Sequence, residues 1–136
     1  MILKQKVIFD SSHRLLNYDG NCKNCHGHSW IVEIEIESNR NLDPCGMLFD
    51  YRAIKNYVKN KWDHRAILNE DDPLVEIFRN MDLAVTTLSG NPTAENIAKN
   101  ILSDMVKLVN IDPENSCDYC SVIVHESNDN SAEENL

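Results

Sequence analysis

Residues 26–37 read His-Gly-His-Ser-Trp-Ile-Val-Glu-Ile-Glu-Ile-Glu. From Val32 to Glu37 apolar and acidic residues alternate, which is the pattern of a β-strand with one face on a core and the other in water. The apolar positions that share one face are Trp30, Val32, Ile34 and Ile36. This stretch predicts a sheet with one wet face.

Two histidines, His26 and His28, open the same stretch. Residues at i and i+2 project from one face of a strand, and imidazole nitrogen is a favoured ligand of zinc. Gly27 between them has no side chain, so another backbone or a substrate can approach closely. His13, upstream, is the candidate third ligand. A three-histidine zinc site usually leaves a fourth position open for water or substrate.

The composition limits the class of protein. With 136 residues, we expect a single domain over residues 1–126 and a polar, acidic, disordered tail over 127–136. No apolar run is long enough to span a membrane and no signal segment is evident, so we expect a cytoplasmic protein without a membrane partner. The net charge of −9 argues against nucleic acid. Five cysteines without a secretion signal favour reduced thiols.

The rest of the chain mixes strand and helix signals. Residues 1–10, 83–88 and 120–124 predict strands, residues 16–23 a loop, and residues 74–79 a short helical turn. One helix follows the candidate cap Asp50, and a second begins around Pro92, with Asn91 and Thr93 as candidate caps. Pro113 lies beyond the end of the second helix. The order predicts an α+β fold with helices on one face of the sheet, and exposed sheet edges favour pairing between subunits.

Five motifs with chemically capable residues follow one another along the chain. They are Phe9-x-x-x-His13-Arg-Leu, Cys22-x-x-x-His26-Gly-His28, Asp63-His64-Arg with Leu68-Asn69, Pro92-Thr-Ala-Glu-Asn96, and Glu126 at the end of the last strand. In this order they resemble the 6-pyruvoyl-tetrahydropterin synthase family. The gap of three residues between Cys22 and the His-Gly-His resembles the 6-carboxy-5,6,7,8-tetrahydropterin synthase branch, which serves queuosine biosynthesis.

The resemblance implies a fold and an assembly. The T-fold of this family is a four-stranded antiparallel sheet with two helices on one face, and sheets join between subunits into a β-barrel. Trimers commonly stack into a homohexamer with active sites at subunit interfaces. The stretch between Asn69 and Asn91 looks longer here than in compact members, so we expect it to reshape the entrance to the pocket.

The resemblance also implies a reaction and a cofactor. A zinc-dependent lyase of the carboxy type converts 7,8-dihydroneopterin triphosphate to 6-carboxytetrahydropterin and releases acetaldehyde and triphosphate. His13, His26 and His28 would hold Zn²⁺, and Cys22 would be the base because a nearby cation lowers a thiol pKa. Asp63 and His64 would provide a second path for protons.

Three residues are candidates for substrate binding. Glu126 would accept the paired N–H donors of the pterin edge, which suit a carboxylate. Thr93 and Glu95 match family positions near the pterin. Arg14 and Lys23 are candidate phosphate contacts by charge alone.

Each role has a simpler alternative. Cys22 could be a fourth zinc ligand in a closed structural site, with Cys25 beside it a bystander. Asp63 and His64 could end a helix, and Thr93 and Glu95 suit a first helical turn whether or not they meet substrate.

The Cys117-x-x-Cys120 pair lacks the context of a redox or zinc motif. His125 is expected at the surface.

Alternatives for the whole protein also stay open. One is a 6-pyruvoyl-tetrahydropterin synthase or a relative that cleaves the pterin side chain like an aldolase. The other, from a different class, is a zinc-stabilised binding module without catalysis.

Overall fold

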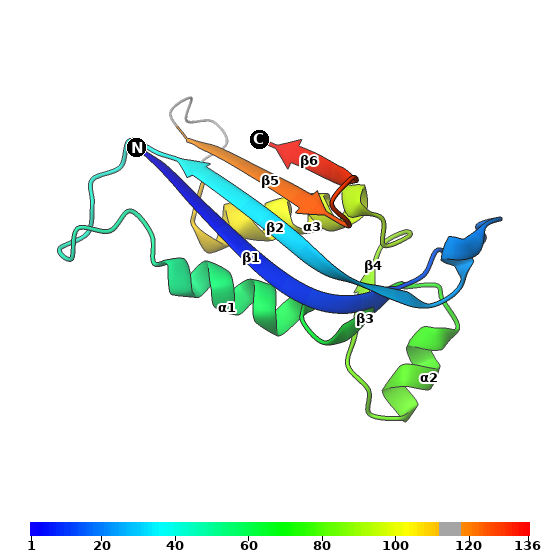
Figure 1. Cartoon of the computed structure of the whole chain (residues 1–136). Helices are drawn as coiled ribbons and strands as arrows, with labels where there is room; N and C mark the ends of the chain where they lie inside the picture. Colours follow the sequence, from blue (N-terminus) through cyan, green and yellow to red (C-terminus); the bar gives the residue numbers. More distant parts are fainter. Residues whose placement is uncertain (112–117) are drawn as a thin grey trace.

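The computed structural model describes residues 1–111 and 118–136. Six strands form one sheet in the order β4-β3-β1-β2-β5-β6 (Figure 1). The strands are β1 (Ile2–His13), β2 (His26–Glu37), β3 (Arg65–Asn69), β4 (Val85–Leu88), β5 (Tyr119–His125) and β6 (Ser131–Asn135). The helices are α1 (Tyr51–Trp62), α2 (Leu74–Asn80) and α3 (Ala94–Leu108), with a short 3-10 turn at Asn21–Lys23. Pro113 and Cys117 lie outside the described residues.

A long hairpin of β1 and β2 forms the centre of the sheet. The two strands pair antiparallel over their whole length, from Ile2 opposite Glu37 to His13 opposite His26. The apolar face expected for β2 is confirmed, because Trp30, Val32, Ile34 and Ile36 are at most 1% exposed. The hairpin therefore separates a buried face from a wet one and brings two of the three histidines together.

Helices α1 and α3 cover the buried face of the sheet (Figure 1). Both begin as the caps predict: the Asp50 carboxylate accepts a hydrogen bond from Arg52 N–H, and the Thr93 hydroxyl accepts one from Asn96 N–H. The stripes that they bury pack into one cluster with the strands: Ile54, Val58 and Trp62 from α1, and Ile97, Ala98, Ile101, Leu102 and Met105 from α3. The helical turn expected at 74–79 is confirmed as α2.

Two details of the sheet differ from the expectation. Strands β1, β2 and β5 form an antiparallel set as expected, with β6 as an unexpected fourth member. The strand expected over 83–88 is confirmed as β4, but it pairs parallel with the unexpected β3, which in turn runs parallel to β1 beside residues 11–13. The residues of β3 give no alternating signal because Ala66, Ile67 and Leu68 are all buried. Such a short apolar run cannot be assigned from periodicity alone.

The tail over 127–136 was expected to be disordered, and this prediction was wrong for residues 131–135. They form β6, which pairs antiparallel with β5 from Ser121 opposite Asn135 to His125 opposite Ser131. The polar composition of the tail predicted disorder, but an edge strand is held by backbone hydrogen bonds and its side chains can stay in water. The tail thus extends the sheet.

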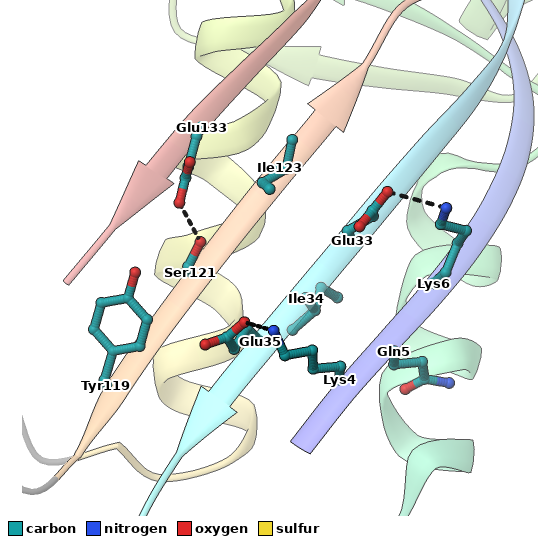
Figure 2. A pocket seen from close by; sticks show the side chains of 10 residues that line it. All are labelled: Lys4, Gln5, Lys6, Glu33, Ile34, Glu35, Tyr119, Ser121, Ile123 and Glu133. Carbon is teal, nitrogen blue, oxygen red and sulfur yellow. Dashed lines mark hydrogen bonds and ion pairs between the residues drawn. The ribbon is translucent and has the colours of Figure 1, made fainter. Parts of the chain in front are cut away.

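The sheet face away from α1 and α3 is polar, as the alternation in β2 predicts. A hollow of about 450 Å³ lies there, and Figure 2 shows the side chains that line it. Lys4 pairs with Glu35 at 2.6 Å, Lys6 pairs with Glu33 at 3.0 Å, and Ser121 donates to Glu133 at 2.9 Å. These charged groups satisfy one another across the strands. Among the described residues, no helix is long and apolar enough to cross a membrane.

Candidate metal centre

Three imidazoles meet at one end of the central hairpin. His13 is the last residue of β1 and lies opposite His26, the first residue of β2, while His28 lies opposite Ser11. One ring nitrogen from each histidine lies within 4.8 Å of the others, and Nε2 of His13 is 3.0 Å from Nε2 of His26. A tetrahedral zinc ion with Zn–N distances near 2.0–2.1 Å needs nitrogen ligands about 3.3 Å apart. The spacing therefore suits a small cation.

Backbone carbonyls fix the orientation of two of these rings. Nδ1 of His13 lies 2.8 Å from the Pro92 carbonyl oxygen, and Nδ1 of His26 lies 2.8 Å from that of Asn24. Since a carbonyl oxygen only accepts hydrogen bonds, each Nδ1 carries a proton, and in the tautomer that binds metals each Nε2 directs a lone pair toward the other ring. Two facing lone pairs repel unless a cation lies between them. The donor set therefore fits a metal ion.

The surroundings keep His13 in the neutral form that binds metals. Its side chain is 2% exposed, and burial, which outweighs the hydrogen bond to Pro92, lowers the pKa of His13 below its usual value. The buried Trp30 ring packs edge-on against His13 and His28, with centroids 4.9 and 5.2 Å away. The apolar Trp30 ring thus packs against the buried side of the histidine cluster.

Glu126 reaches the same cluster from the end of β5. Its Oε1 atom lies 3.3 Å from His13 Nε2 and 3.7 Å from His28 Nε2. The hydrogen bond from Glu126 N–H to the Asn130 carbonyl, 3.0 Å long, closes the turn between β5 and β6 and holds this residue at the centre. Glu126 can therefore face either the ion or a ligand bound beside it.

A pocket of about 480 Å³ adjoins the histidines and gathers most of the predicted site residues. His13, Cys22, Thr93, Glu95 and Glu126 all line it. The half-buried Cys22 comes from the 3-10 turn, and Thr93 also caps α3. Cys25 is exposed and is not among the lining residues.

Glu95 is held as a carboxylate at the edge of this pocket. Its own backbone N–H and the Thr93 hydroxyl donate to it and lower the pKa of the Glu95 carboxyl. Glu95, Glu126 and Asp129 make the lining acidic. The pocket thus suits a neutral ligand rich in N–H donors better than a polyanion.

Asp63 and His64 contact each other, but neither lines the pocket of Cys22, and His64 lines a different hollow. Asp63 Oδ1 is 3.2 Å from His64 Nδ1, and it accepts a hydrogen bond from Asp10 N–H at 2.9 Å. Burial opposes ionisation of Asp63, yet the donors from Asp10, Lys59 and His64 hold the pKa of its carboxyl below the usual range. His64 is 80% exposed, has a φ of 54° and faces a hollow of about 620 Å³ that His28 also lines. Within one chain, Cys22 is absent from this lining.

Arg14 does not have the free charge expected of a phosphate contact. Its guanidinium donates two hydrogen bonds, of 2.7 and 2.6 Å, to the carboxylate of the buried Asp72. Lys23 remains exposed.

The sequence did not predict the role of Asp72, because its partner lies 58 residues away. Nor did it predict that the carbonyls of Pro92 and Asn24 orient two of the rings, because any residue type has a backbone carbonyl.

Comparisons with known proteins show the family of the chain. Residues 2–135 match the model of the 6-pyruvoyl tetrahydropterin synthase family. The chain belongs to this family.

Relatives within the 6-pyruvoyl tetrahydropterin synthase family include two rickettsial proteins named 6-carboxy-5,6,7,8-tetrahydropterin synthase. That of Rickettsia typhi is 34% identical over 115 residues, covering 79% of this chain and 82% of the relative. That of Rickettsia felis is 33% identical over 108 residues, covering 74% and 77%.

Solved structures share the fold of this chain. The Plasmodium vivax 6-pyruvoyltetrahydropterin synthase has a TM-score of 0.66 at 18% identity and covers 100% of this chain and 98% of its own. The Wolinella succinogenes protein WS1659 has a TM-score of 0.73 at 20% identity, with 98% and 97% covered. At these identities the likeness shows the fold alone, and it is the T-fold expected from the motifs.

Proposed function

We propose that this protein is a zinc-dependent lyase of the 6-carboxy-5,6,7,8-tetrahydropterin synthase type. It would act on 7,8-dihydroneopterin triphosphate and release acetaldehyde and triphosphate, in the synthesis of 7-deazapurines such as queuosine. The observation that carries the proposal is that three imidazoles, close enough to hold one ion, adjoin a pocket that His13, the Cys22 thiol and the Glu126 carboxylate line together. The names of the rickettsial relatives support the carboxy branch.

The residues divide the work as follows. His13, His26 and His28 would hold zinc, which supplies Lewis acidity toward the oxygens of the substrate side chain. Cys22 would take a proton from the side chain, and Glu126 would accept the N–H donors of the pterin ring. Thr93 and Glu95 would line the far side of the ring. Because the lining is acidic, the triphosphate would lie at the opening of this pocket and not in its interior.

The second proton path would come from a neighbouring copy of the chain. Since neither Asp63 nor His64 lines the Cys22 pocket and His64 lines a separate hollow in one chain, a second subunit would have to present its own pair to the Cys22 pocket. The sheet leaves room for this assembly, because β3 pairs with β1 only over Ser11–His13 and β6 forms the opposite edge. We therefore propose a homo-oligomer, a trimer or hexamer.

Product analysis with 7,8-dihydroneopterin triphosphate tests the proposal. We expect wild-type protein to release acetaldehyde and triphosphate together. Triphosphate without acetaldehyde would favour the 6-pyruvoyl-tetrahydropterin synthase, and an aldehyde released with the triphosphate still attached would favour the aldolase-like relative.

The Cys22→Ala variant separates catalysis from structure. We expect it to bind zinc and to melt at the wild-type temperature while losing turnover. A loss of zinc and of folding together would show that the thiol is a structural ligand, and would support the binding module without catalysis.

A further inference from the structure

Asn91 connects two segments that meet beside His13. Its side-chain oxygen accepts a hydrogen bond from Leu16 N–H at 2.8 Å, and its side-chain nitrogen donates to the Leu16 carbonyl at 3.0 Å. One amide thus pairs with both backbone groups of a residue 75 positions away. The pairing imitates a rung of a β-ladder where neither segment belongs to a strand.

The two segments that Asn91 joins both determine the position of His13: one contains His13 itself, and the other contains the Pro92 carbonyl that its ring contacts. Leu16 lies three residues after His13 on the chain that leaves β1. Pro92, next to Asn91, provides the carbonyl that lies 2.8 Å from His13 Nδ1. Fixing Leu16 against Asn91 therefore also fixes the distance between the His13 ring and the Pro92 carbonyl.

Asn91 is itself held by its neighbours. Its backbone carbonyl accepts hydrogen bonds from the Asn96 side chain at 2.8 Å and from Thr93 N–H at 2.9 Å. The Asn69 side chain also lies within 3.5 Å of its side-chain oxygen. These bonds connect Asn91 to the start of α3 and the end of β3. Its side chain is therefore held in place, and the pair of hydrogen bonds to Leu16 restricts the motion of Leu16.

From these contacts we propose that Asn91 is a positioning residue for the metal centre: it keeps the Pro92 carbonyl on His13 Nδ1 and thereby turns His13 Nε2 toward the ion. Partners that orient a ligating imidazole commonly change metal affinity by about 10–100-fold when they are removed. Asn91 acts through His13 and contacts neither metal nor substrate. The inference rests on the proposed metal site and adds a residue outside the five motifs.

Zinc competition with a chromophoric chelator provides the first test. Asn91→Ala should raise the zinc dissociation constant by about tenfold, and the visible spectrum of the cobalt-substituted variant should depart from that of wild type. Asn91→Asp, which keeps the acceptor for Leu16 N–H, should have a smaller effect and serves if the alanine variant does not fold.

The matched control is Asn100→Ala. Asn100 is also half-buried, and its side chain donates one bond, to the Asn96 carbonyl within α3 at 3.1 Å. We expect its zinc affinity and cobalt spectrum to equal those of wild type. If Asn91→Ala lowers the melting temperature of the metal-free protein but binds zinc as Asn100→Ala does, the residue is merely structural and the inference is overturned.

A second readout does not depend on metal. Heteronuclear NMR of the imidazole nitrogens in metal-free protein should show His13 with its proton on Nδ1, and Asn91→Ala should mix the two tautomers. An unchanged His13 tautomer in that variant would also overturn the inference. A wild-type protein that shows the expected tautomer but binds no zinc would instead overturn the proposed function while leaving Asn91 in its role.

Discussion

His13, His26 and His28 differ in burial, and this difference decides which of them tests the metal centre best. The His13 side chain is 2% exposed and packs on Trp30, whereas the His28 side chain is 25% exposed and lines an open hollow. Truncating His13 would leave a cavity beside the core and lower stability as well as metal binding. His28 can be removed with less disturbance.

We therefore predict that His28→Ala lowers zinc affinity at least about 100-fold, because a residue that binds the metal directly is removed. The melting temperature of the metal-free protein should change little. Cys22→Ala should keep one zinc per chain. Metal analysis of both variants after dialysis checks this. Equal zinc content in wild type and His28→Ala would contradict the assigned ligand set.

At the scale of the elements, the ion pair between Arg14 and the buried Asp72 connects the end of β1 to the start of α2. The Arg14 guanidinium holds the pKa of the Asp72 carboxyl below its usual range, against an opposing effect of burial, and Asp72 also accepts a hydrogen bond from Leu74 N–H at the start of α2. Because the pKa is lower in the folded protein than in the unfolded chain, the ionised form stabilises the fold above the unfolded pKa. This stabilisation disappears as pH falls through the folded pKa.

Asp72→Asn should accordingly flatten the acid limb of the stability curve. We expect wild type to lose unfolding free energy as pH falls below about 4. The variant should lose less over the same range while being less stable at neutral pH by about 2 kcal/mol, as for the loss of hydrogen bonds to a charged group. Urea unfolding at several pH values measures both quantities. Parallel curves for the two proteins would show that Asp72 does not contribute in this way.

The second prediction for an element concerns β6. Removing residues 131–136 should expose the edge of β5 and lower the melting temperature by several degrees, a change expected for the loss of about 1 kcal/mol or more in a domain of this size. Calorimetry of the truncated chain measures the shift. An unchanged melting temperature would mean that the tail behaves as the composition first indicated.

The elements also show what the sequence could predict. The alternation in β2, the caps Asp50 and Thr93 and the stripes of α1 and α3 are local signals, and all were confirmed. β6 was missed because its side chains are polar and its pairing with the neighbouring β5 runs through the backbone, and β3 was missed because a short, fully buried apolar run has no alternation. Within the site, His13, His26 and His28 were found from local spacing, whereas Asn91 and Asp72 act through contacts 75 and 58 residues away.

At the scale of the whole molecule, the separation of Cys22 from His64 predicts complementation between copies. Cys22→Ala and His64→Ala should each be inactive alone. After the two are unfolded and refolded together, activity should return to about one quarter of wild type, because random assembly pairs an intact Cys22 with an intact His64 at one interface in four. An inactive mixture that forms normal oligomers would place both groups of one active site in one chain.

The most direct test of the central claim is a zinc titration of the metal-free protein with acetaldehyde release as the readout. We propose that His13, His26 and His28, beside the Cys22 thiol and the Glu126 carboxylate, hold one metal ion per chain. We predict that acetaldehyde release from 7,8-dihydroneopterin triphosphate is absent without zinc, rises in proportion to added zinc and saturates at one equivalent per chain. Acetaldehyde release by the metal-free protein, or full zinc loading without any release, would contradict the account.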